Sequence, residues 1–427
     1  MNAREIALKA LVDIDTNETY INTALKEALS VGDLSSVDKG FVTELIYGVI
    51  SNKIAIDFII SRYSKVKIKK MTPWVLNILR MGVFQLHFMD KVPPSAACNE
   101  AVKLANKYSH RAGSGFVNGV LRAVSRGKDD FEFPKMDDIT EELSLEFSYP
   151  IWMTKALIKE YGEEKCRKLF EENNKPHGVF IRVNQLKTTE DGLIETLGKE
   201  GISCEKTEVK NCLKVVGKLN VENSAAYKDG LYSLQNISSQ MAVEALDPNA
   251  DELIVDMCAA PGGKSCAIAE RMGNMGKVFS FDVFSHKVEL IKKSAERLGI
   301  DIITPKVQDS REKIESLVEK ADKVLADVPC SGLGVIHKKP DIKWKRKEED
   351  ILELCALQRD ILETASSYVK KGGTLVYSTC TILPEENRIR IFEFLKNHSE
   401  YKKVSEQQIL TTENGESGFY ICKMIKE

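Results

Sequence analysis

The sequence predicts a multidomain protein: an all-α bundle, then a small α+β module, then an α/β domain built on a mostly parallel, doubly wound sheet. Three observations support this fold class. Helical periodicity and little else runs from residue 2 to about 128, strand-like alternation first appears at 179–184, and strands and helices alternate from 253 onward. A chain of 427 residues is also too long for one ordinary core. We therefore expect domains at 1–128, 129–237 and 238–427.

The composition is that of a soluble globular protein, with 43% hydrophobic and 29% charged residues. No apolar run approaches the roughly 20 residues that a bilayer requires, and no secretory apolar core follows the N-terminus. The ten cysteines are scattered without a C-x-x-C pair, which argues against a zinc site or a disulfide scaffold. We expect a cytoplasmic, monomeric protein in a reducing compartment, with no metal and no membrane partner.

The first 128 residues predict a bundle of about six helices. Thr72-Pro73 is a favourable N-cap and first-turn pair, and the helix after it carries one apolar stripe of Leu76, Leu79, Val83 and Leu86. Ser95 and Ser114 are expected to cap two further helices. No paired carboxylates or histidine clusters occur here, so this domain is expected to bind rather than to catalyse.

Charge is distributed unevenly along this bundle. Residues 1–60 hold 5 Lys/Arg against 9 Asp/Glu, whereas residues 61–128 hold 13 against 2. The basic stretches 62–70 and 103–122 contain aromatic and glycine residues, a mixture suited to a phosphate backbone with splayed bases. The alternative is a solvated helical face. Phe116, Val117 and Leu121 are expected to lie in the core.

The middle segment predicts a small α+β module. Residues 127–134 have turn and charge character without periodicity, so we expect a boundary there. A helix is predicted to begin near 151, a strand at 179–184 and a helix at 189–200. Arg182 is expected to meet either an RNA phosphate or a carboxylate of the neighbouring domain, and the sequence leaves both open.

The C-terminal domain predicts repeated β-α units. Its strands are expected at 253–257, 278–283, 302–307, 323–328 and 374–378, with an edge strand at 418–424, and its helices at 238–246, from about 264, at 285–298, 311–320, 348–370 and 384–397. Such units form a mostly parallel sheet that binds ligands at the carboxyl ends of its strands. The residues whose side chains could bind a ligand or take part in catalysis all fall at such ends.

A small-residue loop follows the first of these strands and predicts a nucleoside pocket. Cys258 stands where a Walker A loop needs glycine, and no G-x-G-x-x-G fingerprint is present. The ligand class that remains is a nucleoside without a polyphosphate. Asp282, at the next strand end, is placed to accept the ribose hydroxyls, and Asp309 to accept from an adenine amine. Helix capping is the alternative for both aspartates.

Two cysteines at neighbouring strand ends indicate thiol chemistry. Cys330 follows Asp327-Val328-Pro329, and Cys380 follows Ser378-Thr379. Cytosine C5 is a weak nucleophile, and a thiolate that adds to C6 makes C5 reactive towards a sulfonium methyl. Lys264 is expected to favour the thiolate and Asp327 to hydrogen-bond the cytosine edge. These residues alone do not say which cysteine attacks.

Three motifs together resemble those of the RNA cytosine-C5 methyltransferases: Cys-Ala-Ala-Pro-Gly-Gly-Lys at 258–264, Asp-Val-Pro-Cys-Ser-Gly at 327–332 and Ser-Thr-Cys at 378–380. Residues 95–102 and 118–122 are similar to pieces of the NusB-like RNA-binding domain. The resemblance covers nearly the whole chain. It implies a NusB-like bundle before a Rossmann-like methyltransferase sheet.

The resemblance also implies roles for single residues. Cys380 is then the nucleophile, Cys330 promotes product release, and the substrate is 16S ribosomal RNA. S-adenosylmethionine is expected to lie against Cys258, Ala259, Ala260, Pro261, Gly262, Gly263, Lys264, Asp282, Asp309 and Asp327. The chain departs from the family pattern at Gln235-Asn236, where members commonly have Gln-Asp, and at 337–344, where they are richer in arginine.

The loop 334–347 is expected to face RNA. It carries six basic residues around Trp344, which suits a target whose base is turned out and stacked on an aromatic ring. The alternative is a solvated loop with Trp344 packed inward. Two other function classes compete with the enzyme: an RNA-binding factor with a vestigial methyltransferase fold, which the intact Cys330, Cys380, Asp327 and Lys264 disfavour, and methylation of a small molecule or protein.

Overall fold

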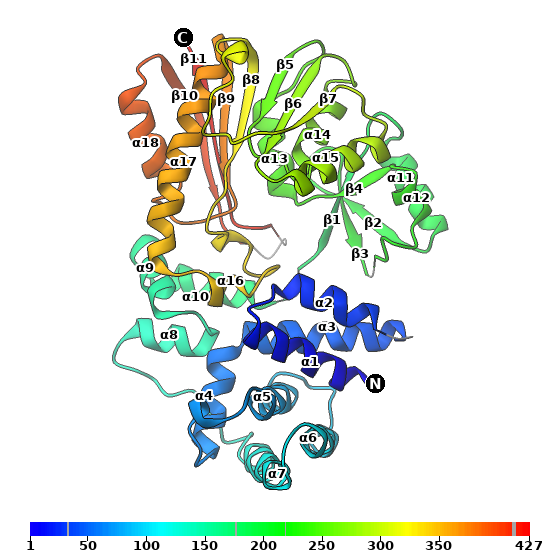
Figure 1. Ribbon diagram of the computed structural model, residues 1–427, viewed down its shortest axis with the longest axis vertical. Coiled ribbons are helices and arrows are strands. Elements are labelled where there is room, and N and C mark those ends of the chain that lie inside the picture. Colours follow the sequence, from blue (N-terminus) through cyan, green and yellow to red (C-terminus); the bar gives the residue numbers. More distant parts are fainter. Residues whose placement is uncertain (32–33, 176, 218, 412–415) are drawn as a thin grey trace. The chain divides into compact units, whose positions relative to one another are not determined.

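The computed structural model describes the whole chain except residues 32–33, 176, 218 and 412–415, and it consists of two compact units (Figure 1). Unit 1 contains residues 1–174 together with 338–346, and unit 2 contains residues 175–337 together with 347–427. The short segment 338–346 therefore belongs to unit 1, although the residues before and after it in the sequence belong to unit 2. This division into two units does not test the three predicted domains, which therefore remain a prediction.

Unit 1 is all-α over its described residues, and its first seven helices form the predicted bundle. The helices are α1 (Ala3–Thr16), α2 (Ile21–Ser30), α3 (Ser36–Ser51), α4 (Lys53–Tyr63), α5 (Pro73–His87), α6 (Pro94–Tyr108), α7 (Arg111–Arg126), α8 (Ile139–Phe147), α9 (Ile151–Tyr161), α10 (Glu163–Asn173) and α16 (Ile342–Lys345), with a 3-10 turn η1 (Ile68–Lys70). One apolar core connects α1 to α7. Val117 and Leu121 are fully buried in it, as predicted, and Phe116 packs against it.

Helix starts in the bundle agree with the sequence at α5 and differ at α6 and α7. Thr72 accepts a hydrogen bond from the backbone of Val75 and Pro73 opens α5, as predicted. Ser95 does not cap α6, because Pro94 supplies the pre-set helical φ of a first-turn residue. Ser114 lies inside α7, where its hydroxyl donates to the carbonyl of Arg111, as buried serines in helices do.

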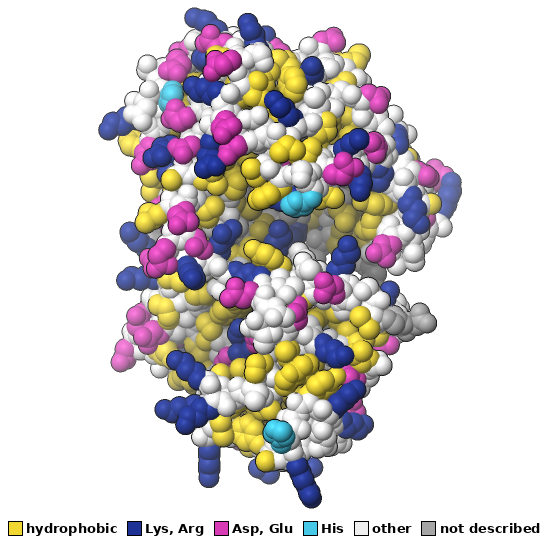
Figure 2. Space-filling model, in the orientation of Figure 1, with side chains coloured by type: hydrophobic (Ala, Val, Ile, Leu, Met, Phe, Trp, Pro, Cys, Tyr) yellow, Lys and Arg dark blue, Asp and Glu magenta, His cyan; other side chains and the backbone are white. Residues whose placement is uncertain are grey.

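Exposed basic side chains cover the part of unit 1 that contains η1, α6 and α7. In Figure 2 dark blue side chains project from the lower end, where Figure 1 labels α7. These exposed residues are Arg62, Lys65, Lys67, Lys69, Lys70, Lys103, Lys107, Arg111, Arg122 and Arg126. The uneven charge seen in the sequence therefore becomes a basic face.

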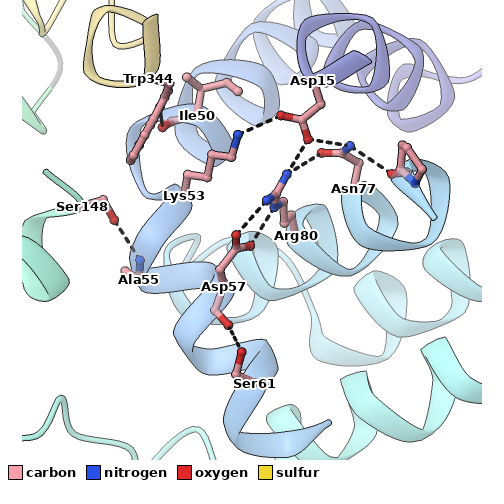
Figure 3. Close-up of polar contacts among 11 residues, drawn as sticks. Asp15, Ile50, Lys53, Ala55, Asp57, Ser61, Asn77, Arg80, Ser148 and Trp344 are labelled. Carbon is pink, nitrogen blue, oxygen red and sulfur yellow. Dashed lines mark hydrogen bonds and ion pairs between the residues drawn. The ribbon is translucent and has the colours of Figure 1, made fainter. Parts of the chain in front are cut away.

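A buried ion-pair network joins α1, α4 and α5 within the bundle (Figure 3). The guanidinium of Arg80, only 4% exposed, donates to both oxygens of Asp57 at 2.7 Å and also to Asp15. Lys53 pairs with the other oxygen of Asp15 at 2.9 Å. Every charged group of the network has a partner of opposite sign, which is the condition for burying such charges.

The segment 338–346 packs into unit 1, and the prediction that Trp344 stacks on RNA is wrong. Its indole Nε1 donates to the backbone carbonyl of Ile50 at 2.9 Å (Figure 3). The ammonium group of Lys343, 1% exposed, donates to the carbonyls of Ser51 and Phe147 at 3.2 Å. Burial holds the pKa of Lys343 well below its ordinary value. This part of the loop is an internal anchor of unit 1.

Unit 2 begins with a four-stranded antiparallel sheet in the order β2-β3-β1-β4. It comprises β1 (Val179–Val183), α11 (Glu190–Lys199), β2 (Ser203–Lys206), β3 (Cys212–Val216), α12 (Ala225–Lys228) and β4 (Tyr232–Leu234). This is the predicted α+β module. Both faces of β1 are buried: Ile181 and Val183 contribute to the small core of the module, and Phe180 and Arg182 lie on the opposite face.

A seven-stranded sheet in the order β10-β11-β9-β8-β5-β6-β7 forms the rest of unit 2. Its elements are α13 (Ile237–Leu246), β5 (Leu253–Asp256), α14 (Gly263–Arg271), β6 (Lys277–Asp282), α15 (Ser285–Leu298), β7 (Ile303–Val307), η2 (Glu315–Leu317), β8 (Ala321–Asp327), η3 (Leu333–Val335), α17 (Glu348–Tyr368), β9 (Val369–Thr379), α18 (Arg388–Asn397), β10 (Tyr401–Ile409) and β11 (Phe419–Lys426). Strands β5 to β9 run parallel, as predicted. Helices α17 and α18 cover one face, and α13, α14 and α15 the other (Figure 1).

Two expectations for this sheet are wrong, and one strand was missed. The helix at 311–320 does not form, since only the single turn η2 is helical there. Strand β11 is not an edge strand, because it pairs with β9 on one side and β10 on the other. Strand β10 was not predicted, because it forms the edge of the sheet beside β11, where exposed charged and polar residues replace the apolar alternation.

In the described part of the chain, no helix has both the length and the apolar character that crossing a membrane requires.

Candidate active site

The carboxyl ends of five parallel strands bring the predicted site residues to one edge of the sheet. The loop after β5 follows Asp256, Asp282 ends β6, and Asp327 ends β8. Backbone hydrogen bonds connect these ends: Ala259 donates to Phe281 at 2.7 Å, and Met257 donates to Leu325 at 2.9 Å. The structure therefore places the small-residue loop beside the ends of β6 and β8.

The loop itself requires glycine at position 262. Gly262 has φ +102° and precedes the first turn of α14, and a Cβ there would lie 3.1 Å from the Cα of Ile291. The hydroxyl of Ser294 donates to the carbonyl of Pro261 at 3.1 Å. Helix α15 therefore presses against the outer side of the loop, and only a residue without a side chain fits between them. The inner side faces the strand ends.

Asp256 lies at the base of the loop and was not among the predicted site residues. Its carboxyl group is completely buried and accepts from the hydroxyl of Ser265 at 2.6 Å, while its Oδ1 atom has no hydrogen-bond partner in the described chain. Burial raises the pKa of Asp256 to about 7. A buried carboxyl oxygen without a partner, beneath a nucleoside-type loop, is suited to a site that receives a hydrogen-bonding group of a ligand.

We expect Asp256→Asn to change how stability depends on pH. The pKa of about 7 in the folded state exceeds the ordinary 3.8, so the folded chain keeps a proton that the unfolded chain releases. Wild-type stability therefore falls as pH rises through about 4 to 7. The variant should gain roughly 2 to 3 kcal/mol relative to wild type between pH 5 and pH 8. Denaturant unfolding at both pH values checks this. Asp229→Asn, at an exposed position, should show no gain, and parallel profiles for wild type and Asp256→Asn would contradict the prediction.

Arg182 pairs with a carboxylate and does not project towards solvent. It is 4% exposed and makes a two-pronged ion pair with Glu270 of α14 at 2.8 and 2.9 Å. The same guanidinium donates to the carbonyl of Gly263 at 2.7 Å and to the side chain of Gln235. Of the two alternatives, the domain carboxylate is the correct one. A residue of the α+β module thus fixes the loop and the start of α14.

Lys264 and Asp327 form an ion pair at the loop's inner side. The ammonium Nζ lies 2.6 Å from Asp327 Oδ2, and Ser378 donates to Asp327 Oδ1 at 2.8 Å. Burial alone would lower the pKa of Lys264, but the Asp327 carboxylate outweighs it and holds that pKa above its ordinary value. Lys264 therefore stays a cation, and its charge also acts on Cys380.

The two predicted thiols lie in contact. The sulfur atoms of Cys330 and Cys380 are 2.9 Å apart, because β8 and β9 are adjacent parallel strands with Asp327 opposite Ser378. The hydrogen bond with the Cys380 sulfur, together with burial, raises the pKa of Cys330 well above its ordinary value. The two thiols therefore interact directly at the ends of these adjacent strands.

Asp282 and Asp309 each have a local partner. Asp282 accepts from the backbone N–H of Phe284 at 3.1 Å, a local turn contact, and it does not cap α15, whose N-cap residue is Phe284. Both carboxylate oxygens of Asp309 pair with the guanidinium of Arg311, and that hydrogen bonding lowers the pKa of Asp309. Asp282 keeps its place at a strand end beside the loop. For Asp309, an adenine amine would have to share the carboxylate with Arg311.

Glu386 and Asn387 belong to the site and were missed. They are 0% and 1% exposed and contact the residues next to both cysteines. Burial raises the pKa of Glu386. The sequence assigned them to the first turn of a helix at 384–397, where acidic residues are usual. Helix α18 begins only at Arg388, so no periodicity marked these two residues as buried.

Comparison with known families gives three matches along the chain. Residues 243–424 match a family described as 16S rRNA methyltransferase RsmB/F, and residues 1–126 match the NusB family. Residues 149–222 match a ferredoxin-like domain described as RsmF/B-like. The order of the three matches follows the order of the bundle, the small sheet and the large sheet.

Similar proteins extend over the full length. The chain is 38% identical to a probable ribosomal RNA small subunit methyltransferase B of Bacillus subtilis, covering 100% of this chain and 99% of that protein. It is 31% identical to ribosomal RNA small subunit methyltransferase B of Escherichia coli, covering 100% and 99%. The crystal structure of PH0851 superposes with a TM-score of 0.84 at 30% identity, covering 99% of this chain and 98% of that one. A structure described as NSun6 from Pyrococcus horikoshii with SFG shares the fold over 64% of this chain and 97% of that one, at TM-score 0.58 and 21% identity.

Proposed function

Because this chain belongs to the RsmB/F family of 16S rRNA methyltransferases, we propose that it methylates C5 of a cytosine in 16S ribosomal RNA. In this proposal Cys380 is the nucleophile and Cys330 promotes product release. The observation that carries it is the contact of the two sulfur atoms, 2.9 Å apart, beside the Lys264–Asp327 ion pair. Members of this family depend on S-adenosylmethionine.

The chemistry requires a thiolate that attacks C6 and a second group that takes up the proton lost from C5. Cys380 Sγ adds to cytosine C6, and the electron pair of the C5–C6 bond makes C5 nucleophilic. S-adenosylmethionine, when bound, supplies an electrophilic methyl group. A base must then take the C5 proton, and as the electron pair of the C5–H bond re-forms the C5–C6 double bond, the Sγ–C6 bond breaks and Cys380 leaves as a thiolate. Cys330, whose sulfur lies 2.9 Å from that of Cys380, is proposed to be this base in its own thiolate form.

Lys264 and Asp327 prepare this site electrostatically. The charge of Lys264 favours the anionic form of Cys380, because a nearby cation stabilises a thiolate. Asp327 is held by both Lys264 and Ser378, so its carboxylate is fixed in place to meet the N3/N4 edge of a cytosine. Fixed polar groups of this kind need no reorganisation during the reaction.

The cofactor pocket is proposed to consist of Cys258 to Lys264 with Asp282, Asp309 and Asp327. One observation supports the fit of a nucleoside there: the buried Asp256 Oδ1, beneath the loop, has no hydrogen-bond partner in the described chain. Asp282 would hold the ribose hydroxyls, as strand-end carboxylates do in dinucleotide folds.

The basic face of unit 1 is the proposed RNA-binding surface. Its ten exposed lysine and arginine residues lie on α4, η1 and the loop around it, α6 and α7 (Figure 2). Neutralising phosphates with such residues makes affinity strongly salt-dependent. We also propose that the protein acts as a cytoplasmic monomer; both cysteines, Lys264 and Asp327 come from one unit of one chain, so the proposed chemistry needs no residue of a second copy.

Methyl transfer to 16S ribosomal RNA tests the function. Purified protein with methyl-labelled S-adenosylmethionine should label a 16S transcript or a partly assembled subunit, and bisulfite sequencing should locate one methylated cytosine that a deletion strain lacks. RNA affinity should fall by at least a factor of 10 between 50 and 200 mM salt. Label on a different base would contradict the proposed chemistry. A flat salt response would remove the basic face from the interface.

A further inference from the structure

A buried turn follows Cys380 and returns the chain to both cysteines. It runs from Thr381 to Asn387, between β9 and α18, and backbone hydrogen bonds from Asn387 and Ile389 to Pro384 close it. Glu386 and Asn387, neighbours in sequence, are both buried within it. A charged and an amide side chain are costly to bury unless their hydrogen bonds are satisfied.

Glu386 holds the segment around Cys330. Its Oε2 atom accepts from the backbone N–H of Ser331 at 2.8 Å, and its Oε1 accepts from the Ser331 hydroxyl. The side chain of Gln358 donates to Glu386 Oε2 at 2.8 Å and also to the carbonyl of Pro329 at 2.9 Å. The residues on either side of Cys330 are therefore fixed by one carboxylate and its amide partner.

Asn387 holds the segment around Cys380 in the same way. Its Oδ1 atom accepts from the hydroxyl of Thr379 at 2.6 Å, and its Nδ2 donates to the carbonyl of Thr381 at 3.1 Å. A further bond from Nδ2 to Gln408 at 2.8 Å ties the amide to β10. The residues on either side of Cys380 are thus fixed by one amide.

One further hydrogen bond joins the segment that Glu386 holds to the segment that Asn387 holds. The hydroxyls of Ser331 and Thr381, each next to a cysteine, are 2.7 Å apart. The separation of the two sulfur atoms therefore depends on side chains from one dipeptide.

We propose that Glu386 and Asn387 are positioning residues of the methyl transfer reaction, Glu386 for Cys330 and Asn387 for Cys380. This inference rests on the proposed roles of the two cysteines. It predicts that these two neighbouring residues affect different steps of the reaction. Loss of the Glu386 contacts slows product release, and loss of the Asn387 contacts slows nucleophilic attack.

The experiment compares two isosteric variants in the full-length protein. Glu386→Gln places an amide where two donors of Ser331 must be accepted, and Asn387→Asp removes the donor to Thr381. The readouts are the fraction of protein that runs as a covalent RNA complex on denaturing gels, and the rate of methyl transfer to 16S RNA. Glu385→Gln, exposed and adjacent, is the matched control. Cys330→Ala and Cys380→Ala run beside them as references for the proposed function.

Glu386→Gln is expected to accumulate the complex while turnover falls roughly 10- to 100-fold, the range that a small misplacement of a reacting group produces. Asn387→Asp is expected to form the complex roughly 10- to 100-fold more slowly. Glu385→Gln should match wild type in both readouts. If either isosteric variant does not fold, Ser331→Ala and Thr379→Val remove single hydroxyls from the same contacts and should give the same two directions with smaller effects.

Equal loss of complex and turnover in both variants, or in both of the smaller substitutions, would overturn the inference, because a merely structural role lowers the two together. The reference variants separate this outcome from failure of the proposed function. If Cys330→Ala does not accumulate the complex, the assigned cysteine roles fail. If it does and Glu386→Gln does not, only the positioning role fails.

Discussion

Cys380→Ala is expected to abolish both methyl transfer and the covalent RNA complex, whereas Cys330→Ala is expected to trap that complex. Without the Cys380 sulfur, no bond to C6 forms and C5 keeps its low nucleophilicity. Without Cys330, attack and methylation proceed, but the group beside Cys380 that assists release is lost. Removing a nucleophile of this kind should lower the rate by roughly four orders of magnitude or more.

Denaturing gels with labelled RNA, together with counting of transferred methyl groups, measure both outcomes. Cys204→Ala is a suitable control, because Cys204 is half-buried on β2 and lies outside the methyltransferase sheet. Its activity should stay near wild type. Methyl transfer by Cys380→Ala would refute the assignment of the nucleophile, and a trapped complex in that variant instead would exchange the two roles.

Arg182→Met is expected to cost about 3 to 5 kcal/mol of stability, because it leaves the Glu270 carboxylate buried without a cation. Glu270 is 3% exposed, so water cannot replace the guanidinium. The same change removes the donor to the Gly263 carbonyl in the cofactor loop. We therefore also expect about a tenfold rise in the KM for S-adenosylmethionine. Denaturant unfolding and initial-rate kinetics check the two effects.

A double-mutant cycle identifies the cause. Arg182→Met combined with Glu270→Met should recover much of the lost stability, since a paired charge replaced by apolar side chains is often neutral. Arg359→Ala, which breaks an exposed ion pair with Asp360, should change stability by less than about 1 kcal/mol. If the double variant is as unstable as Arg182→Met alone, the unpaired charge is not the reason.

The large sheet and the main site residues could be predicted because parallel strands end at one edge. Once the strands before Lys264, Asp327 and Cys380 are recognised, their meeting follows from topology alone. The contacts that hold them could not be predicted in this way. Glu386 and Arg182 act through buried polar pairs whose partners lie far away in sequence, as with Arg182 and Glu270, and periodicity carries no information on such pairs.

The loop around Trp344 shows why charge is a weak guide to exposure. Its lysines suggested an RNA contact, yet Lys343 is buried with carbonyl oxygens as its acceptors and Trp344 donates to Ile50, almost three hundred residues earlier. A long aliphatic stem with a single polar end can be buried where enough acceptors converge on that end. Only the three-dimensional structure shows that convergence.

The anchoring of residues 338–346 in unit 1 also affects the order of events during synthesis. Helices α1 to α10 leave the ribosome well before the segment that completes their unit. At translation rates of roughly 5 to 20 residues per second, the delay is on the order of 10 to 30 s. During that time the backbone carbonyls of Ile50, Ser51 and Phe147 lack the hydrogen bonds that Lys343 and Trp344 later donate to them. The nascent N-terminal unit therefore reaches its final state only when most of the methyltransferase sheet has also been made.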